Sequence, residues 1–143
     1  MGRTDPIFST RQRVYYQHTD AGGVVFHANY LAFMEAARTE FLIHRGFNPV
    51  ELVDRDAVMF VVRGIRIDYS RPARLNDLLT ITAEVAKVGF ASLDFTQRVL
   101  RDCANGVTEE LVSARVELGC ADPRSFKPVR MPRSVRTTLG QLE

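Results

Sequence analysis

The sequence lacks any apolar run close to the roughly 18 residues that a membrane-spanning helix needs, and the polar segment Met1 to Pro6 lacks the apolar core of a secretory signal. These two absences predict a chain without a membrane span that stays in the cytoplasm. Internal repeats and low-complexity tracts are also missing. With 143 residues, 45% hydrophobic and 25% charged, we expect a single domain over residues 1–143.

Cysteine and net charge are scarce as well. Cys103 and Cys120 show neither a CxxC pair nor another metal-ligand spacing, so we expect two reduced structural thiols. A net charge of +2 is too small to indicate a nucleic-acid partner. Basic residues do gather near the C-terminus, as a solvated tail or as a phosphate-binding cluster: Arg124, Lys127, Arg130, Arg133 and Arg136.

The hydrophobic pattern predicts one long helix from Tyr30 to Arg45. Its apolar residues recur at steps of three and four, and Gly46 and Pro49 follow as stop signals. The members of this stripe are Tyr30, Phe33, Met34, Ala37 and Phe41. Glu35 and Arg38 are three residues apart near its border and are placed to pair.

Elsewhere the period is two, which indicates strands. They are expected at about Ile7–Tyr16, Met59–Tyr69, Leu79–Val85, Ala91–Val99 and Val112–Cys120, with a short helix near Ser134–Leu139 at the end. Arg63 interrupts the second strand, and Asn105-Gly106 predicts a type I′ hairpin turn. The alternation indicates an antiparallel sheet with one covered face. The fold class is therefore α+β, a curved sheet of about five strands wrapped around one long helix. The open edges of such a sheet favour a homodimer at least.

The stretch from Tyr16 to Tyr30, YQHTDAGGVVFHANY, is unusual for a connector. A carboxylate, Asp20, precedes a Gly-Gly pair that takes positive φ or lets another group approach the backbone. Asn29 is a good N-cap for the helix that follows. Because a helix N-terminus offers unpaired N–H groups and partial positive charge, the stretch suits a site where negative charge is bound or develops.

This stretch, together with the helix residues FMEAARTE from Phe33, resembles the 4-hydroxybenzoyl-CoA-thioesterase-like hotdog family. Within that family the chain looks most similar to the acyl-CoA thioesterases associated with the Tol-Pal system of bacteria. Further likeness lies in Asp68–Asp77, Phe95–Arg98 and Asp122–Pro132. The resemblance implies a hotdog fold, homodimers or homotetramers that bind acyl-CoA near an interface, and hydrolysis of the thioester to a carboxylic acid and CoA. We expect no cofactor, because the hydrolysis of a thioester does not strictly require a metal.

Carried over by position, the resemblance makes Asp20 the catalytic carboxylate, as nucleophile or general base. It makes the backbone N–H of His27 the donor to the thioester carbonyl, and the His27 ring a second catalytic candidate. Gly23 and Tyr30 become candidates for substrate binding. His18 stands where these relatives usually carry an acidic residue, and Phe26 where they often carry Tyr.

The chemistry itself needs a nucleophile or an activated water, and donors for the oxyanion. Asp20 also fits a plain Asx turn before glycine. The His27 ring can orient substrate, carry a proton or bond a backbone carbonyl. Tyr30 and Met34 fit the core or an acyl pocket, and Glu35 fits a surface or interface ion pair.

Three other classes of protein are alternatives to a thioesterase. His18, Asp20 and His27 superficially offer the two-histidine, one-carboxylate set of non-haem iron enzymes. A serine hydrolase is poorly supported, because this sequence contains no GxSxG nucleophile elbow. A CoA- or lipid-binding dimer without turnover is the main alternative. CoA phosphates call for cations at the mouth of the cleft, and the candidates, each otherwise a plain surface charge, are Arg71, Lys87, Arg124 and Lys127.

Overall fold

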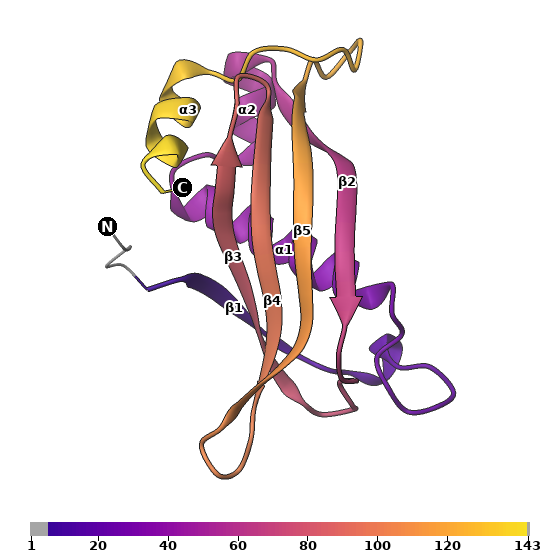
Figure 1. The fold of residues 1–143 in the computed structure, drawn as a ribbon. Coiled ribbons are helices and arrows are strands. Elements are labelled where there is room, and N and C mark those ends of the chain that lie inside the picture. The colour runs from indigo at the N-terminus through magenta and orange to yellow at the C-terminus, as the bar shows by residue number, and fades with distance from the viewer. Residues whose placement is uncertain (1–5, 143) are drawn as a thin grey trace.

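The computed structural model describes residues 6–142, in which a strand and two helices precede four strands and a last helix (Figure 1). The elements are β1 Phe8–Arg13, α1 Asn29–His44, α2 Pro49–Asp56, β2 Met59–Tyr69, β3 Leu78–Val88, β4 Ser92–Asp102, β5 Thr108–Ala121 and α3 Arg133–Gly140, with a 3₁₀ turn at Tyr16–His18 after β1. Within the described range, no helix combines the length and apolar composition that crossing a membrane requires.

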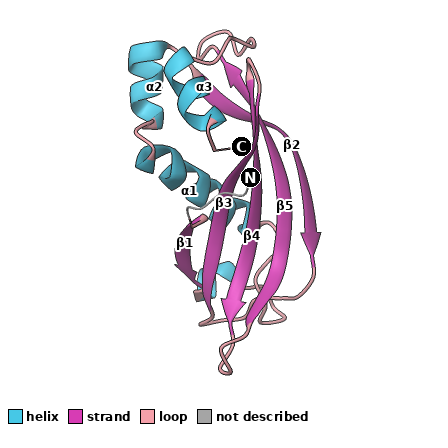
Figure 2. Ribbon diagram, turned by 60° about the vertical axis from the view of Figure 1, so that its left-hand side comes forward, coloured by secondary structure: helices cyan, strands magenta, loops and turns pink. Residues whose placement is uncertain are grey.

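The five strands form one antiparallel sheet in the order β1-β3-β4-β5-β2. The sheet is curved, and α1, α2 and α3 lie on the same side of it (Figure 2). The expected α+β class, with an antiparallel sheet of five strands curved around a long helix, is therefore confirmed. β2 is an edge strand, and its backbone is unpaired along one side.

The core lies between α1 and the concave face of the sheet. Every residue of the stripe expected on the helix is buried, from Tyr30 to Phe41. Phe41 packs edge-on against Phe95 of β4, with ring centroids 5.4 Å apart. Burying an aromatic side chain of this size contributes roughly 1.5–3 kcal/mol. The stripe that the sequence shows is thus the surface that attaches α1 to the sheet.

The helix α2 was not expected, because Pro49 was interpreted only as a stop signal. Asn48 accepts the Val50 N–H at 2.9 Å and caps α2, and Pro49 occupies the first turn. Both are ordinary helix-start features. Gly46, with φ of +93°, does end α1 as expected.

The turn between β4 and β5 is not type I′. Only Gly106 has positive φ there, +81°, and Asn105 does not. Gly106 N–H donates to the Cys103 carbonyl at 3.0 Å, and Cys103 N–H donates to the Val107 carbonyl at 2.8 Å. This is a three-residue loop with glycine in the left-handed position.

Arg63 interrupts the alternation of β2 because the strand bulges there. The pairing with β5 shifts register between Val62 and Gly64, so that Arg63 has no opposite residue. Its side chain lies over Gly119, where an added Cβ would come within 2.6 Å of Arg63 Cδ. The missing side chain of Gly119 therefore leaves room for the bulged arginine.

Candidate active site

The loop before α1 is a tight turn around Asp20. The Asp20 N–H donates to the Val24 carbonyl at 2.9 Å, and the Gly23 N–H donates to the Asp20 carbonyl at 3.0 Å. Gly23 has φ of +80°, a value that glycine adopts without steric cost. Asp20 Oδ1 accepts the Gly22 N–H at 2.8 Å, which is an Asx turn. Its Oδ2 has no partner among residues 6–142 and is free for other chemistry.

His18 attaches this loop to the helix. Its buried ring stands edge-on to Phe33, with centroids 4.9 Å apart. Nδ1 accepts the Tyr15 N–H at 2.9 Å, so a neutral ring carries its proton on Nε2. The His18 carbonyl accepts from Phe26 N–H at 2.9 Å and from Asn29 Nδ2 at 2.7 Å.

The prediction that Asn29 caps the helix was wrong. Asn29 is the first residue of α1, the N-cap is Ala28, and no side chain among residues 6–142 caps the helix. The amide of Asn29 is instead used by the His18 carbonyl, because the loop folds back beside the first turn. Within residues 6–142, neither the His27 N–H nor the Ala28 N–H has an acceptor. The start of α1 therefore presents free donors.

A cavity of about 270 Å³ lies next to these donors. It is lined by Val25, His27, Tyr30, Tyr69, Ser70, Arg71 and Pro72. The Tyr30 hydroxyl accepts the Ala73 N–H at 3.0 Å, and the Tyr69 hydroxyl donates to the His27 carbonyl at 3.1 Å. Burial raises the pKa of Tyr30, so its hydroxyl stays neutral and is able to donate.

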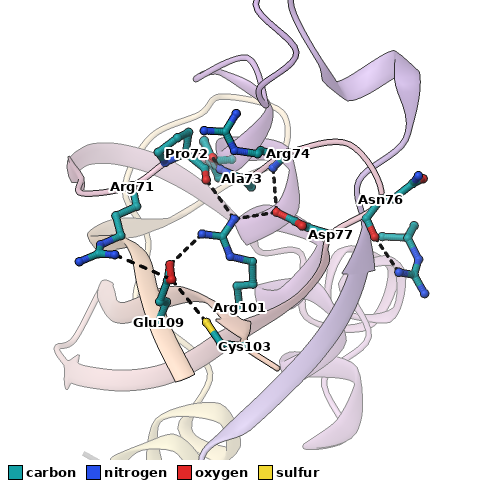
Figure 3. A network of polar contacts seen from close by, with 11 residues as sticks. Arg71, Pro72, Ala73, Arg74, Asn76, Asp77, Arg101, Cys103 and Glu109 are labelled. Carbon is teal, nitrogen blue, oxygen red and sulfur yellow. Dashed lines mark hydrogen bonds and ion pairs between the residues drawn. The ribbon is translucent and has the colours of Figure 1, made fainter. Parts of the chain in front are cut away.

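Arg71 and Pro72 of the cavity lining belong to a network of hydrogen bonds and ion pairs (Figure 3). The Arg101 guanidinium donates to Asp77 at 2.8 Å, to Glu109 at 2.7 Å and to the Pro72 carbonyl at 3.2 Å. Hydrogen bonds to both carboxylates raise the pKa of Arg101. Arg71, which lines the cavity, lies 3.8 Å from Glu109. The network therefore attaches the 70–77 loop to the hairpin of β4 and β5.

The structure brings together three of the expected site residues, since His27, Tyr30 and Arg71 line the cavity. Asp20 and Gly23 are exposed on the adjoining loop, which leads into the cavity wall at Val25. The Phe26 ring is exposed and contacts the His27 ring, with centroids 4.5 Å apart.

The other three candidates lie elsewhere. Lys87 is near the end of β3, and Arg124 and Lys127 follow β5. These strand ends lie at the opposite end of the sheet from the segment between β1 and α1 (Figure 1). At that end, the guanidinium groups of Arg130 and Arg136 both stack on the exposed ring of Phe90. Their Cζ atoms lie 5.2 and 4.6 Å from the ring centroid.

Sequence reasoning missed Tyr69, Ser70 and Pro72 as cavity residues. The segment was noticed as a motif, but its position beside α1 depends on the sheet. The iron-site alternative is not supported, since no three His, Cys, Asp or Glu side chains in the described part of the chain are grouped to hold a metal ion. Glu35 and Arg38 do not form an ion pair either, because Arg38 donates to Gln97.

Comparison with known proteins gives a consistent set of relatives. The thioesterase superfamily matches residues 22–103. The acyl-CoA thioesterase YbgC of Haemophilus influenzae is 42% identical over 139 residues, which cover 97% of this chain and 98% of that protein. A probable thioesterase from Bartonella henselae superposes with a TM-score of 0.81 at 36% identity, over 89% of this chain and 100% of the other.

The fold extends to more distant structures. A 4-hydroxybenzoyl-CoA thioesterase with bound 4-hydroxybenzoyl-CoA superposes with a TM-score of 0.86 at 18% identity, over 92% of this chain and 96% of the other. At this identity the match speaks for the fold alone.

Proposed function

We propose that this chain hydrolyses acyl-CoA to a carboxylic acid and CoA. The premise is that the chain belongs to the thioesterase superfamily. The observation that carries the proposal is the start of α1, where His27 lines a cavity beside the Asp20 turn and its N–H has no acceptor among residues 6–142. Donors fixed before the reaction begins stabilise an oxyanion without reorganising.

Besides donors for the oxyanion, the reaction needs a nucleophile or a base that activates water, and we assign this role to Asp20. Its Oδ2 has no partner in the described part of the chain, while the bond between Oδ1 and Gly22 N–H restricts the orientation of the carboxylate. As a general base, Asp20 takes a proton from water as the water oxygen bonds the thioester carbon. The oxyanion then collapses, the C–S bond breaks, and the proton passes to the leaving thiolate. As a nucleophile, an Asp20 oxygen bonds the thioester carbon, the C–S bond breaks, and CoA leaves as the thiolate, which takes a proton from solvent. Water then hydrolyses the resulting anhydride, which releases the carboxylic acid and restores the Asp20 carboxylate.

The oxyanion in either route is assigned to the His27 N–H. Removing one such donor typically costs about 10²–10³ in rate. The His27 ring lies edge-on to the Tyr69 ring at 6.4 Å, within the cavity wall, where it is placed to orient the substrate.

A second copy of the chain completes the site in this proposal. In one subunit Asp20 is exposed and does not line the cavity. The edge strand β2 leaves Val62, Ile65 and Tyr69 exposed, and pairing through this edge would cover them. We therefore assign a homodimer or homotetramer.

The phosphates of CoA are assigned to cations in two places. Arg71 is at the cavity. Lys87, Arg124 and Lys127 lie at the far end of the sheet, so they reach the same CoA only from another subunit. Both cysteines are free, which suits a reducing compartment, and we propose the cytoplasm.

The test is a panel of acyl-CoA substrates, from short to long aliphatic chains plus aroyl-CoA, with release of free CoA thiol as the readout. We expect turnover of at least one group of substrates, unchanged by a chelator. Binding of acyl-CoA without thiol release from any member would contradict hydrolysis and favour the CoA- or lipid-binding dimer. Loss of turnover on chelation would contradict the metal-free mechanism.

A further inference from the structure

The segment between β2 and β3, residues 70–77, supplies part of the wall of the cavity at the proposed catalytic site. Its two ends are attached to neighbouring strands by the backbone. The N–H groups of Ser70 and Arg71 donate to one carbonyl of β5 at 2.8 and 3.1 Å, and the carbonyl of Asp77 accepts the N–H of the residue after β1 at 2.9 Å. Because these bonds lie at the ends of the segment, the position of its middle, residues 72–74, depends on other contacts.

Ala73, in the middle of the segment, connects this wall to the rest of the proposed site. It is fully buried. Its carbonyl accepts the Val25 N–H at 2.9 Å, and its N–H donates to the Tyr30 hydroxyl at 3.0 Å. Val25 belongs to the loop that carries Asp20, where the Asp20 N–H donates to the Val24 carbonyl at 2.9 Å. The backbone of Ala73 is therefore hydrogen-bonded both to the Asp20 loop and to the first turn of α1.

Arg101 of β4 holds the residues on both sides of Ala73 (Figure 3). Its NH1 donates to the Pro72 carbonyl at 3.2 Å and to Asp77 Oδ2 at 2.8 Å. The same carboxylate oxygen accepts the Arg74 N–H at 2.8 Å. One guanidinium therefore ties both neighbours of Ala73 to the central part of the sheet, directly at Pro72 and through Asp77 at Arg74.

A second carboxylate orients the Arg101 guanidinium. NH2 donates to Glu109 Oε2 at 2.7 Å, and the side chains of Arg101, Asp77 and Glu109 are only 21–25% exposed. Because the guanidinium is planar and presents its donors in fixed directions, bonds to carboxylates on two sides restrict its orientation. It also lies between two negative charges that water screens only in part. Lysine would supply the charge at this position without the two-sided geometry.

Arg101 is not one of the described residues that line the cavity, and we assign it no contact with substrate. We propose that Arg101 is a positioning residue, which holds the Ala73 backbone in the place where it fixes the Asp20 loop for catalysis. The kinetic consequence rests on the proposed hydrolysis of acyl-CoA. The effect on the position of the loop does not, because it follows from hydrogen bonds within the folded chain.

The kinetic test begins with Arg101→Met, which removes the charge and the hydrogen bonds but keeps an unbranched side chain. A misplacement of about 1 Å can cost about 10²-fold in rate. We expect kcat for thiol release to fall at least tenfold, with KM changed less than threefold. Arg101→Lys restores the charge alone and should be at least threefold faster than Arg101→Met. Arg98→Met is the matched control on the same strand, where Arg98 pairs with the exposed Glu110, and its kcat should equal that of wild type.

A second control separates positioning from a general loss of stability. Val135 is fully buried in α3, which lies at the opposite end of the sheet from the 70–77 segment (Figure 1). Val135→Ala leaves a small cavity and destabilises the fold, but it should leave kcat unchanged. Circular dichroism and thermal unfolding check that each variant is folded at the assay temperature.

Amide hydrogen exchange, followed by mass spectrometry, tests the position of the loop without turnover. Local opening exposes amides that hydrogen bonds otherwise protect. In Arg101→Met, the protected amides within residues 22–30 and 70–78 should exchange at least tenfold faster than in wild type. Those within residues 112–120, in the middle of β5, should exchange at the wild-type rate.

Four results would each overturn the proposal. They are a wild-type kcat in folded Arg101→Met, an equal loss of kcat in Arg98→Met or Val135→Ala, no gain in kcat from Arg101→Lys over Arg101→Met, and unchanged exchange within residues 22–30 and 70–78. If wild type releases thiol from no acyl-CoA while exchange changes as expected, the positioning of the loop by Arg101 is supported and the proposed function fails.

Discussion

The Tyr69 hydroxyl donates a hydrogen bond of 3.1 Å to the carbonyl of His27, which lies 42 positions earlier in the chain. Tyr69 is the last residue of β2, and His27 is two residues before α1. This bond therefore links the end of the edge strand to the peptide whose donors begin the helix. We therefore expect this bond to help position the proposed oxyanion donor.

Tyr69→Phe removes this bond and keeps the ring. Because the bond is exposed, the expected loss in free energy of unfolding is about 0.5–1 kcal/mol, at the lower end for a hydrogen bond. We also expect a lower kcat with little change in KM, because the start of α1 is held less firmly. Urea unfolding and thiol-release kinetics measure the two effects. Tyr16→Phe is the control and should behave as wild type, because the hydroxyl of Tyr16 has no partner in residues 6–142.

Asp20→Asn preserves the Asx turn, since an asparagine oxygen also accepts the Gly22 N–H, but it removes the charge. We expect kcat to fall by about 10²–10⁴-fold, the usual contribution of a positioned acid or base. Asp20→Ala should be at least as slow. Near wild-type turnover in either folded variant would remove Asp20 from the mechanism, and Asp54→Asn on α2 serves as the matched carboxylate control.

His27→Ala tests the ring and leaves the backbone N–H in place. We therefore expect a smaller decrease in kcat than for Asp20→Asn, measured in the same thiol-release assay. An unchanged rate would exclude a role for the His27 ring but not for the His27 backbone N–H. A decrease as large as that of Asp20→Asn would contradict the assignment of oxyanion stabilisation to the backbone.

Glu109 makes stability depend on pH in the acid range. Hydrogen bonds from Arg101 and then Cys103 lower the pKa of Glu109 below its ordinary 4.5. A carboxylate with a lowered pKa in the folded state stabilises the protein above its unfolded pKa, and this contribution is lost as the pH falls through the folded value. Wild type should thus exceed Glu109→Gln in stability at pH 7, and the difference should shrink from about pH 4.5 downward.

Urea unfolding at a series of pH values measures that difference. Glu110→Gln, on the same strand and in an exposed pair with Arg98, is the control for simple loss of charge. A difference between wild type and Glu109→Gln that stays constant from pH 7 to pH 3 would contradict the role of the network.

The two cysteines should differ in reactivity. Burial raises the pKa of Cys120 to about 11, so its thiol is neutral and enclosed at pH 8. The Cys103 thiol is partly exposed, and its hydrogen bond to Glu109 raises its pKa. A disulfide reagent such as DTNB should modify Cys103 slowly and Cys120 only after unfolding. Glu109→Gln should speed the first reaction, and equal rates for both thiols in native protein would refute the assignment.

Local sequence was sufficient for the elements whose signals are local. The apolar stripe of α1 and the alternation in β3, β4 and β5 predicted those elements, because periodicity reports directly which face is covered. α2 was missed although Asn48 and Pro49 carry its start signal. The hairpin turn was mistaken because Asn105-Gly106 fits two loop lengths, and strand register decides between them.

The candidate site divides in the same way. Asp20, His27 and Tyr30 were predicted together because they are neighbours in one stretch. Tyr69, Ser70 and Pro72 reach the cavity only because β2 pairs with β5 and ends beside α1. Arg124 and Lys127 looked equivalent to Arg71 in the sequence, yet the sheet separates them by its full length. No local pattern encodes that separation.

By itself, the sequence predicted which residues would carry the proposed chemistry, and it determined which face of α1 is buried, because both depend on spacing within one segment. Tertiary structure decided what surrounds those residues. The tertiary structure brings the Tyr69 hydroxyl to the His27 carbonyl. It also buries Arg38 beside Gln97, which is 59 positions away, so that Arg38 does not pair with Glu35. The physical reason is that burial and hydrogen-bond partners arise from packing between distant segments, whereas periodicity records only that a face is covered.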